Sequence, residues 1–325
     1  MRNCSKNIVT AKKDIASIVP KALTIFAPVE NHRKREKGLL VYPVYSRRSE
    51  GLSLGINLFP DKKCCSFDCP YCEVFPFSTD AIFSLEEMEE DLRNAIAAAI
   101  ERNVPVKDIC FSGNGEPTLS PNFPAALKRA ARLREELIPS ANLVLITNGT
   151  GLLDAGLFPL LREAALSSGL DIWLKVDAGT PGWYGEMNRS NIPFEKLIEK
   201  IKDFASCAPI TIQTMLCAVD GKGPPPEEEE TWGKLIVELL AIAALSAAES
   251  KGGGIRKVQI YGKARPAPED PKAQALPTEY LEKRAVSLRS VIATAIAETL
   301  TLAAKKADAL DATGTANPPN VEVYT

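Results

Sequence analysis

Three cysteines stand close together at Cys65, Cys69 and Cys72, with three and two residues between them. Cysteine thiolates ligate iron–sulfur clusters, which are commonly held by four of them. Because this run supplies three, a fourth iron would have no protein ligand and could bind a substrate or a cofactor. The spacing therefore predicts an iron–sulfur cluster with one open coordination position.

Zinc is the competing interpretation of these residues. A structural zinc ion takes four ligands, usually from two pairs of residues. The chain offers a single histidine, His32, and no second Cys-x-x-Cys pair. A site of three cysteines and His32 stays open, but the shortage of ligands favours the cluster.

The other cysteines are interpreted differently. Cys64 could in principle replace its neighbour, but the recognisable spacing is counted from Cys65. We expect Cys110, Cys207 and Cys217 to be small buried hydrophobic residues in or beside strands. A tight cysteine group in a chain of 325 residues with no secretory signal indicates metal or redox chemistry in a reducing cytoplasm. No apolar run is long enough, at about eighteen residues, to cross a membrane.

The elements that must position these cysteines alternate along the chain. Strands are predicted at residues 52–58, 108–112, 142–147, 171–176, 209–216 and 257–261. Helices are predicted at residues 84–102, 124–136, 159–167, 193–205, 228–248 and 278–300. This alternation favours an α/β fold with parallel strands and right-handed crossovers. Periodicity does not separate a partial (β/α)6 barrel of TIM type from a flat doubly wound sheet.

Polar residues follow three of these strands where each ends. Residues 113–116 read Gly-Asn-Gly-Glu, Asn148 follows the next strand, and Asp177 the one after it. Each residue alone is typical of a turn or a cap. An α/β barrel binds its ligand at the carboxyl ends of its strands. The recurrence therefore indicates a common binding site at that edge.

Charge is uneven along a chain whose net charge is −2. Residues 1–48 carry eleven Lys and Arg against three Asp and Glu, an excess of +8, which leaves about −10 for the remainder. The basic stretch 32–37, with Arg47 and Arg48, is either a nucleic-acid contact or a solvated, flexible N-terminus. If the partner is RNA, this segment should border the cluster opening.

The cysteine spacing, with Tyr71 just before Cys72, resembles the signature of the radical S-adenosylmethionine (SAM) superfamily. Residues 112–118 resemble its Gly-Gly-Glu motif, with Asn114 in place of the first Gly of that motif. These motifs, with residues 55–60, 147–149 and 175–177, resemble the iron–sulfur oxidoreductases related to wyosine-type tRNA modification enzymes. The resemblance covers about residues 51–265.

The resemblance implies a radical SAM partial barrel with a [4Fe–4S] cluster on Cys65, Cys69 and Cys72. SAM would chelate the fourth iron, and an electron from the cluster would cleave it to methionine and a 5′-deoxyadenosyl radical that abstracts hydrogen from a substrate. It also implies an external electron donor of flavodoxin or ferredoxin type, whereas the cytoplasmic location and the absence of a membrane partner are expected from the cysteine placement and the lack of a long apolar run. The substrate is either a tRNA base or a small molecule, and a non-catalytic Fe–S or zinc-binding module is the alternative.

The resemblance also implies candidate SAM contacts, whereas no catalytic side chain is predicted. Glycines at 113 and 115 would let the backbone approach the amino-acid end of SAM, and Glu116 would face its ammonium group. Asp177 would accept from ribose hydroxyls, and Tyr71 would lie against adenine. The full set is Tyr71, Gly113, Asn114, Gly115, Glu116, Asn148, Asp177, Gln213 and Tyr261.

Three segments are predicted. Residues 1–50 form a basic N-terminal extension, residues 51–300 the partial barrel, and residues 301–325 a poorly ordered C-terminal tail.

Overall fold

The computed structural model describes residues 39–265, 267, 272–307 and 320–324. Within them, nine strands form one sheet in the order β1-β2-β3-β4-β5-β6-β7-β9, with β8 paired to β6 beside this path. The strands are β1 Val41–Ser46, β2 Gly51–Asn57, β3 Val106–Ser112, β4 Asn142–Thr147, β5 Leu170–Lys175, β6 Pro209–Val219, β7 Gly254–Gly262, β8 Ala273–Ala275 and β9 Asn320–Tyr324.

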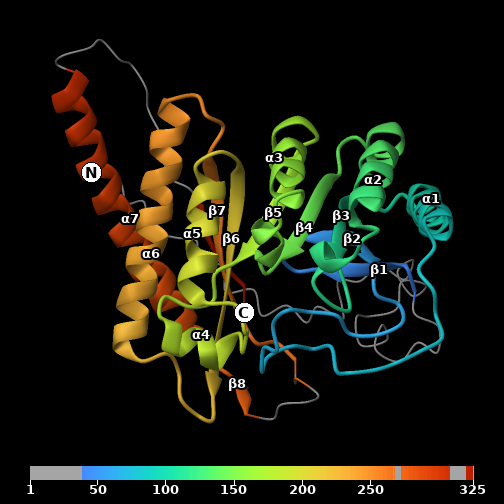
Figure 1. Cartoon of the computed structure of the whole chain (residues 1–325), viewed down its shortest axis with the longest axis horizontal. Helices are drawn as coiled ribbons and strands as arrows, with labels where there is room; N and C mark the ends of the chain where they lie inside the picture. The colour runs from blue at the N-terminus through green and yellow to red at the C-terminus, as the bar shows by residue number, and fades with distance from the viewer. Residues whose placement is uncertain (1–38, 266, 268–271, 308–319, 325) are drawn as a thin grey trace, which may run out of the picture.

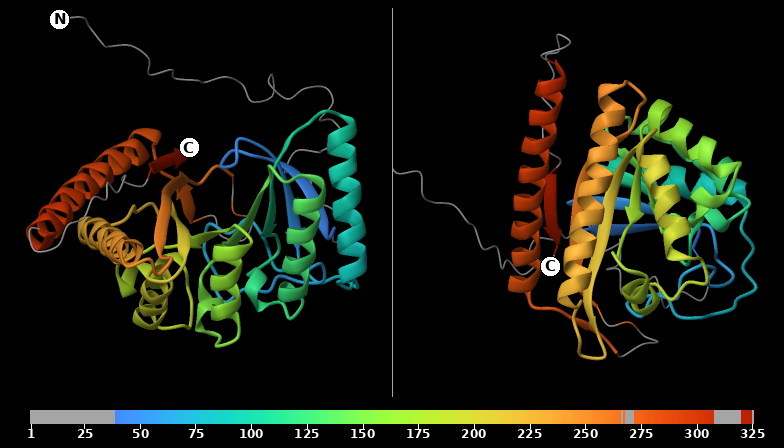
Figure 2. Two further views of the ribbon diagram at one scale, coloured as in Figure 1. Left: turned by 90° about the horizontal axis from the view of Figure 1, so that it is seen from above. Right: turned by 60° about the vertical axis from the view of Figure 1, so that its left-hand side comes forward.

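The sheet is mostly parallel. Strands β2 to β7 and then β9 pair in parallel, whereas β1 joins β2, and β8 joins β6, in antiparallel fashion. Each parallel strand lies beside the next one in the chain, so the order never reverses as it does in a doubly wound sheet. Figure 2 shows the helices following one another along the outside of a curved sheet. The predicted α/β partial barrel is confirmed, and the flat alternative is excluded.

The helices lie between the strands in the chain (Figure 1). They are α1 Leu85–Glu101, α2 Phe123–Leu137, α3 Leu157–Ser167, α4 Pro181–Met187, α5 Phe194–Ala205, α6 Pro226–Ala248 and α7 Thr278–Ala307, with single 3₁₀ turns η4 Pro117–Leu119 and η5 Thr150–Leu153. The start of α1 illustrates a local cause, because the Ser84 hydroxyl accepts from the Glu87 backbone N–H at 3.2 Å. None of the described helices has the length and apolar character needed to cross a membrane.

The two faces of the sheet differ in chemistry. On the outer face, Ile109, Phe111, Ile172 and Leu174 are fully buried in the main hydrophobic core. The residues between them on the same strands point to the other face, because side chains alternate along a strand. There, Cys110, Val144 and Trp173 form a small separate cluster, and polar side chains surround it. The outer face therefore holds the helices, and the inner face is left for a site.

The two edges of the curved sheet approach each other. The Tyr324 hydroxyl on β9 lies 3.3 Å from the carbonyl oxygen of Arg48, in the turn between β1 and β2. These residues belong to opposite ends of the strand order. The curl therefore brings the β1–β2 hairpin across to the last strand, and the two edges touch at this contact.

The domain limits predicted at residues 50 and 301 differ from the structure. Strand β1 lies inside the predicted extension, and β9 lies inside the predicted tail, where α7 also continues to Ala307. Both missed strands are sheet edges of five or six residues, and their pairing with β2 and β7 stabilises them more than their local sequence does. The basic stretch 32–37 and most of the tail lie outside the described residues.

Smaller differences concern short elements and one cysteine. Helix α4 and strand β8 were not predicted, because seven and three residues are too short for a periodic pattern. Cys110 and Cys217 are buried as expected, whereas Cys207 is half-buried at the end of α5.

Candidate active site

The loop that carries Cys65, Cys69 and Cys72, called the cysteine loop below, follows β2 at the carboxyl edge of the parallel strands. Its first part is hydrogen-bonded to the loop after β3. The Cys64 N–H donates to the Asn114 carbonyl at 3.1 Å, and the Glu116 N–H donates to the Cys64 carbonyl at 2.8 Å. Gly115 lies between these bonds, and a Cβ there would stand 1.8 Å from the Cys64 carbonyl oxygen. Gly115 thus permits the close backbone approach expected of it, but the chain it approaches is the cysteine loop.

Two further contacts fix the same loop. The Ser66 hydroxyl lies 2.8 Å from the Thr150 hydroxyl beyond β4, and the Ser190 hydroxyl donates to the Ser66 carbonyl at 3.0 Å. The Asp68 N–H donates to the Asn188 carbonyl at 2.9 Å, just after α4. The loop is therefore anchored to the ends of three successive β/α units, which holds its cysteines over the inner face.

The sulfur atoms of the three cysteines have defined neighbours. Cys65 Sγ accepts from the Phe67 N–H at 3.4 Å and from Asn148 Nδ2 at 3.6 Å. Cys69 Sγ accepts from Asn188 Nδ2 at 3.7 Å. The Cys72 thiol faces the Val74 carbonyl at 3.6 Å. N–H donors directed at sulfur suit thiolates, which accept hydrogen bonds more strongly than neutral thiols do.

Three cysteines on one loop supply the thiolate donors that iron–sulfur clusters use. Within the described residues, no three His, Cys, Asp or Glu side chains are grouped so as to hold one metal ion. A cluster requires no such grouping, because each cysteine binds its own iron. Burial raises the pKa of the Cys69 thiol to about 12, whereas a bound metal favours the thiolate. His32, the alternative zinc ligand, lies outside the described residues.

Glu116 is buried and bound within the protein. Its Oε1 accepts from the hydroxyls of Thr118 at 2.6 Å and Thr147 at 2.7 Å, and its Oε2 accepts from the Asn148 N–H at 2.7 Å. Burial raises its pKa, although these hydrogen bonds oppose the shift. The side chain was predicted to face the SAM ammonium group; in the structure it joins the end of β4 to the loop after β3.

The side-chain oxygen and nitrogen of Asn148 are also both hydrogen-bonded within the protein. Its Oδ1 accepts from the N–H and the hydroxyl of Thr150 at 3.0 and 2.8 Å, and its Nδ2 donates to Ser66 Oγ at 2.9 Å as well as to Cys65. The side chain therefore supports the cysteine loop directly.

Asp177 is the centre of a second buried group. Its carboxylate accepts from the Tyr71 hydroxyl, from Asn188 Nδ2 at 2.9 Å and from the Met215 N–H at 2.9 Å. The Lys175 ammonium lies 3.4 Å from it. The ribose contact predicted for Asp177 would have to compete with these partners, which bind Tyr71 of the cysteine loop to the sheet.

Lys175 connects this group to later strands. Its ammonium donates to the Tyr261 hydroxyl at 2.6 Å and lies 4.7 Å from the centre of the Tyr71 ring, a cation–π contact. Burial alone would lower the Lys175 pKa, but Asp177, Tyr261 and Cys69 together outweigh it and raise that pKa. Tyr71, Asp177 and Tyr261, predicted separately, thus come together around a lysine that was not singled out.

Gln213 belongs to a row of polar side chains across the inner face. Lys175, Gln213, Gln259 and Glu322 are in register on β5, β6, β7 and β9. Gln213 Oε1 accepts from Arg48 Nη1 at 3.1 Å, Gln213 Nε2 donates to Gln259 Oε1 at 2.7 Å, and Gln259 Nε2 donates to Glu322 Oε2 at 3.2 Å. Because arginine only donates and an ionised carboxylate only accepts, both amides have one orientation.

Arg48 is placed differently from the sequence-based expectation. Its guanidinium lies 5.5 Å from the ring centre of Trp173 and 5.3 Å from that of Tyr261. The side chain is half-buried on the inner face, where its partners occupy it. It is therefore not an exposed phosphate contact.

The structure divides the predicted site residues into two groups. Cys65, Glu116 and Asn148 meet beyond β3 and β4, and Cys69, Tyr71 and Asp177 meet beyond β5 with Tyr261. Asn188 and Ser66 were missed. Asn188 follows the short helix α4 and has no motif around it, whereas Ser66 stands within the recognised cysteine spacing.

Residues 62–220 match the sequence profile described as the Radical SAM superfamily. The chain therefore carries a radical SAM domain. A solved structure, described as a radical SAM methyltransferase from Sphaerobacter thermophilus, superposes with a TM-score of 0.54 at 14% identity and covers 86% of this chain and 68% of that one. That likeness shows the fold.

Several curated relatives are called UPF0026 proteins. One from Helicobacter pylori is 39% identical over 93 residues, which are 28% of this chain and 29% of that protein. The UPF0026 protein slr1464 of Synechocystis is 30% identical over 181 residues, which are 54% of this chain and 63% of that protein. The chain thus spans less than two thirds of the length of these relatives.

Proposed function

We propose that the chain is a radical SAM enzyme with a [4Fe–4S] cluster on Cys65, Cys69 and Cys72. When bound and reduced by the external donor, the cluster would supply one electron that cleaves the S–C5′ bond of SAM to give methionine and a 5′-deoxyadenosyl radical for hydrogen abstraction. The observation that carries the proposal is the three-cysteine loop anchored at the carboxyl edge of a radical SAM domain.

The residues of this chain would position and shield that chemistry. The bonds of Cys64 with Asn114 and Glu116 hold the loop against β3, and those of Ser66 and Asp68 hold it over β4 and α4. Tyr71 and Asp177 bury the end of the loop against β5. Because Glu116, Asn148 and Asp177 are engaged internally, we assign them supporting roles.

The proposed partners follow from this chemistry. An external donor of flavodoxin or ferredoxin type would reduce the cluster, and the polar inner face favours a substrate with hydrogen-bonding groups. A tRNA base and a small polar molecule both meet that requirement. RNA binding measured across a salt series separates them, since phosphate contacts make binding salt-dependent.

Anaerobic reconstitution tests the proposal. The wild-type chain should take up four irons and four sulfides per chain, and with dithionite it should convert SAM to 5′-deoxyadenosine. Cys65→Ala, Cys69→Ala and Cys72→Ala should each abolish this conversion. Cys64→Ala is the matched control, and it should keep both the cluster and the activity.

Two results would contradict the proposal. One is a triple cysteine variant that retains the full iron and sulfide load. The other is a fully loaded wild-type chain that never cleaves SAM, which would favour the non-catalytic Fe–S module.

A further inference from the structure

Two buried asparagines approach the sulfur atoms of the cysteine loop from different elements. Asn148 follows β4, and its Nδ2 lies 3.6 Å from Cys65 Sγ; Asn188 follows α4, and its Nδ2 lies 3.7 Å from Cys69 Sγ. Their exposed fractions are 3% and 2%. Two of the three cysteines thus have a buried carboxamide directed at sulfur.

The orientation of the Asn148 amide follows from its other contacts. Its Oδ1 accepts from the backbone N–H of Thr150 at 3.0 Å, and a backbone N–H can only donate. The oxygen must therefore face Thr150, which leaves Nδ2 on the side of Ser66 and Cys65. With two hydrogens on Nδ2, one bond to each of these partners is possible.

The side-chain amide of Asn188 is also oriented by a second hydrogen bond, here to a carboxylate. Its Nδ2 lies 2.9 Å from Asp177 Oδ2, which as a carboxylate oxygen accepts and does not donate. Asp177 is in turn held by the Met215 N–H and the Tyr71 hydroxyl. One Nδ2 hydrogen of Asn188 is directed at Asp177, which leaves the other for Cys69.

We propose that Asn148 and Asn188 are positioning residues that raise the reduction potential of the cluster through hydrogen bonds to the Cys65 and Cys69 thiolates. The inference rests on the proposed function, because it needs the cluster. Reduction moves one electron from the external donor into the cluster, with no proton transferred. It makes the cluster and its ligands more negative, so N–H donors to sulfur stabilise the reduced form more than the oxidised one.

The test replaces each carboxamide by an apolar side chain of similar size. Asn148→Leu and Asn188→Leu should each lower the equilibrium constant for reduction about tenfold, which is ~59 mV for a one-electron couple. The midpoint is measured by potentiometric titration of the reconstituted protein, followed by the EPR signal of the reduced cluster. Gln259→Leu is the matched control, since Gln259 is a fully buried carboxamide bonded to Gln213 and Glu322. Its midpoint should equal that of the wild type.

Iron and sulfide analysis separates failure of this inference from failure of the proposed function. Fully loaded Leu variants with the wild-type midpoint would overturn the inference and leave the cluster intact. A wild-type chain that binds no cluster would overturn both.

A second measurement needs no variant and covers the case in which the Leu variants do not load. Wild-type protein is prepared with asparagine labelled by ¹⁵N in the side-chain amide only, and the reduced cluster is examined by pulsed EPR. A weak coupling to the labelled nitrogen is expected. Its absence would overturn the inference.

Discussion

The outer and inner faces of the sheet are built from the same strands but are stabilised in different ways. Ile172 and Leu174 of β5 pack into the main core under the helices, whereas Trp173 and Lys175 of the same strand face a polar network. Burial of apolar surface has no direction, so the outer face tolerates changes of shape better than changes of polarity. Hydrogen bonds and ion pairs are directional, so the inner face fixes the positions of individual atoms. The outer face therefore provides stability, and the inner face provides geometry.

The largest effect is expected on the outer face. Phe111 is fully buried and packs edge-on against Phe123 of α2, with ring centres 5.5 Å apart. Phe111→Ala should lower the free energy of unfolding by about 3–5 kcal/mol, because it removes buried apolar surface and leaves a cavity. Urea denaturation measures this change. A loss below about 1 kcal/mol would mean that this face is not the main source of stability.

The next effect is expected on the inner face, where Lys175 is paired with Asp177. Lys175→Met should cost about 3 kcal/mol, because it leaves a buried carboxylate without its cation. Adding Asp177→Asn should recover part of the loss, although the same change applied alone should destabilise. Denaturation of the two single variants and the double variant measures the coupling. Strictly additive losses would show that the pair does not act as a unit.

A smaller effect is expected at the end of β4. The Thr147 hydroxyl donates to Glu116 at 2.7 Å and accepts from the Gly149 N–H at 3.1 Å. Thr147→Val keeps the shape but removes both bonds, and it should cost about 1–2 kcal/mol. Thr147→Ser keeps the hydroxyl and is the control. Equal losses for the two variants would assign the effect to packing instead of hydrogen bonding.

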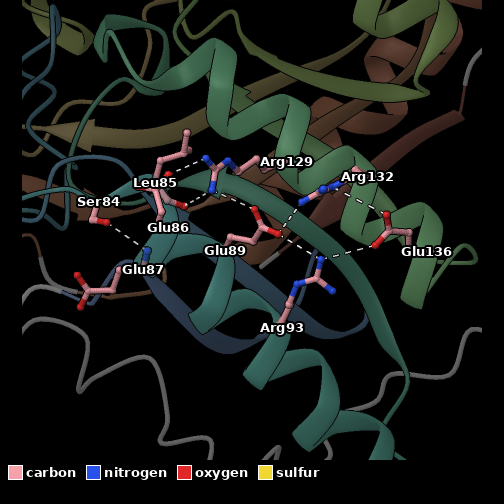
Figure 3. A network of polar contacts seen from close by, with 9 residues as sticks. All are labelled: Ser84, Leu85, Glu86, Glu87, Glu89, Arg93, Arg129, Arg132 and Glu136. Atoms are coloured by element: carbon pink, nitrogen blue, oxygen red, sulfur yellow. Dashed lines mark hydrogen bonds and ion pairs between the residues drawn. The ribbon is translucent and has the colours of Figure 1, made fainter.

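The smallest effect is expected in the ion network between α1 and α2, on the helical layer (Figure 3). Glu89 lies 3.2 Å from Arg93, 3.1 Å from Arg129 and 2.5 Å from Arg132. Desolvation alone would raise the Glu89 pKa, but the arginines hold it below its ordinary value of 4.5. The Glu89 side chain is 16% exposed and its arginines are 30–51% exposed, so solvent and salt screen these ion pairs. Glu89→Gln should therefore destabilise less than Thr147→Val, and less again at high salt.

The sign of the pH dependence follows from that lowered pKa. The contribution of Glu89 is complete above its unfolded-state value of 4.5 and is lost as the pH falls through the folded-state pKa. The stability difference between wild type and Glu89→Gln should therefore close on acidification, as followed by urea denaturation at several pH values. A difference that stays constant from neutral pH to below the folded-state pKa would contradict the assignment.

The sequence by itself determined the features that depend on local spacing. Cys65, Cys69 and Cys72 define the loop, residues 113–116 define the tight approach beside it, and apolar runs define six of the parallel strands. The strand order did not follow from the sequence, because the same alternation of strands and helices fits both a partial barrel and a doubly wound sheet. The assignment of the SAM contacts and of the wyosine-related branch stays a prediction.

Only the tertiary structure decided which polar side chains meet. Asn188 reaches Cys69 from a helix too short to be predicted, and Arg48 reaches Gln213 across 165 positions of the chain. The pairing of β9 with β7 and the partners of Glu116 likewise depend on residues far apart in sequence. A motif specifies the type of each residue, but its hydrogen-bond partners are settled by the curl of the sheet, which brings distant strand ends to one edge.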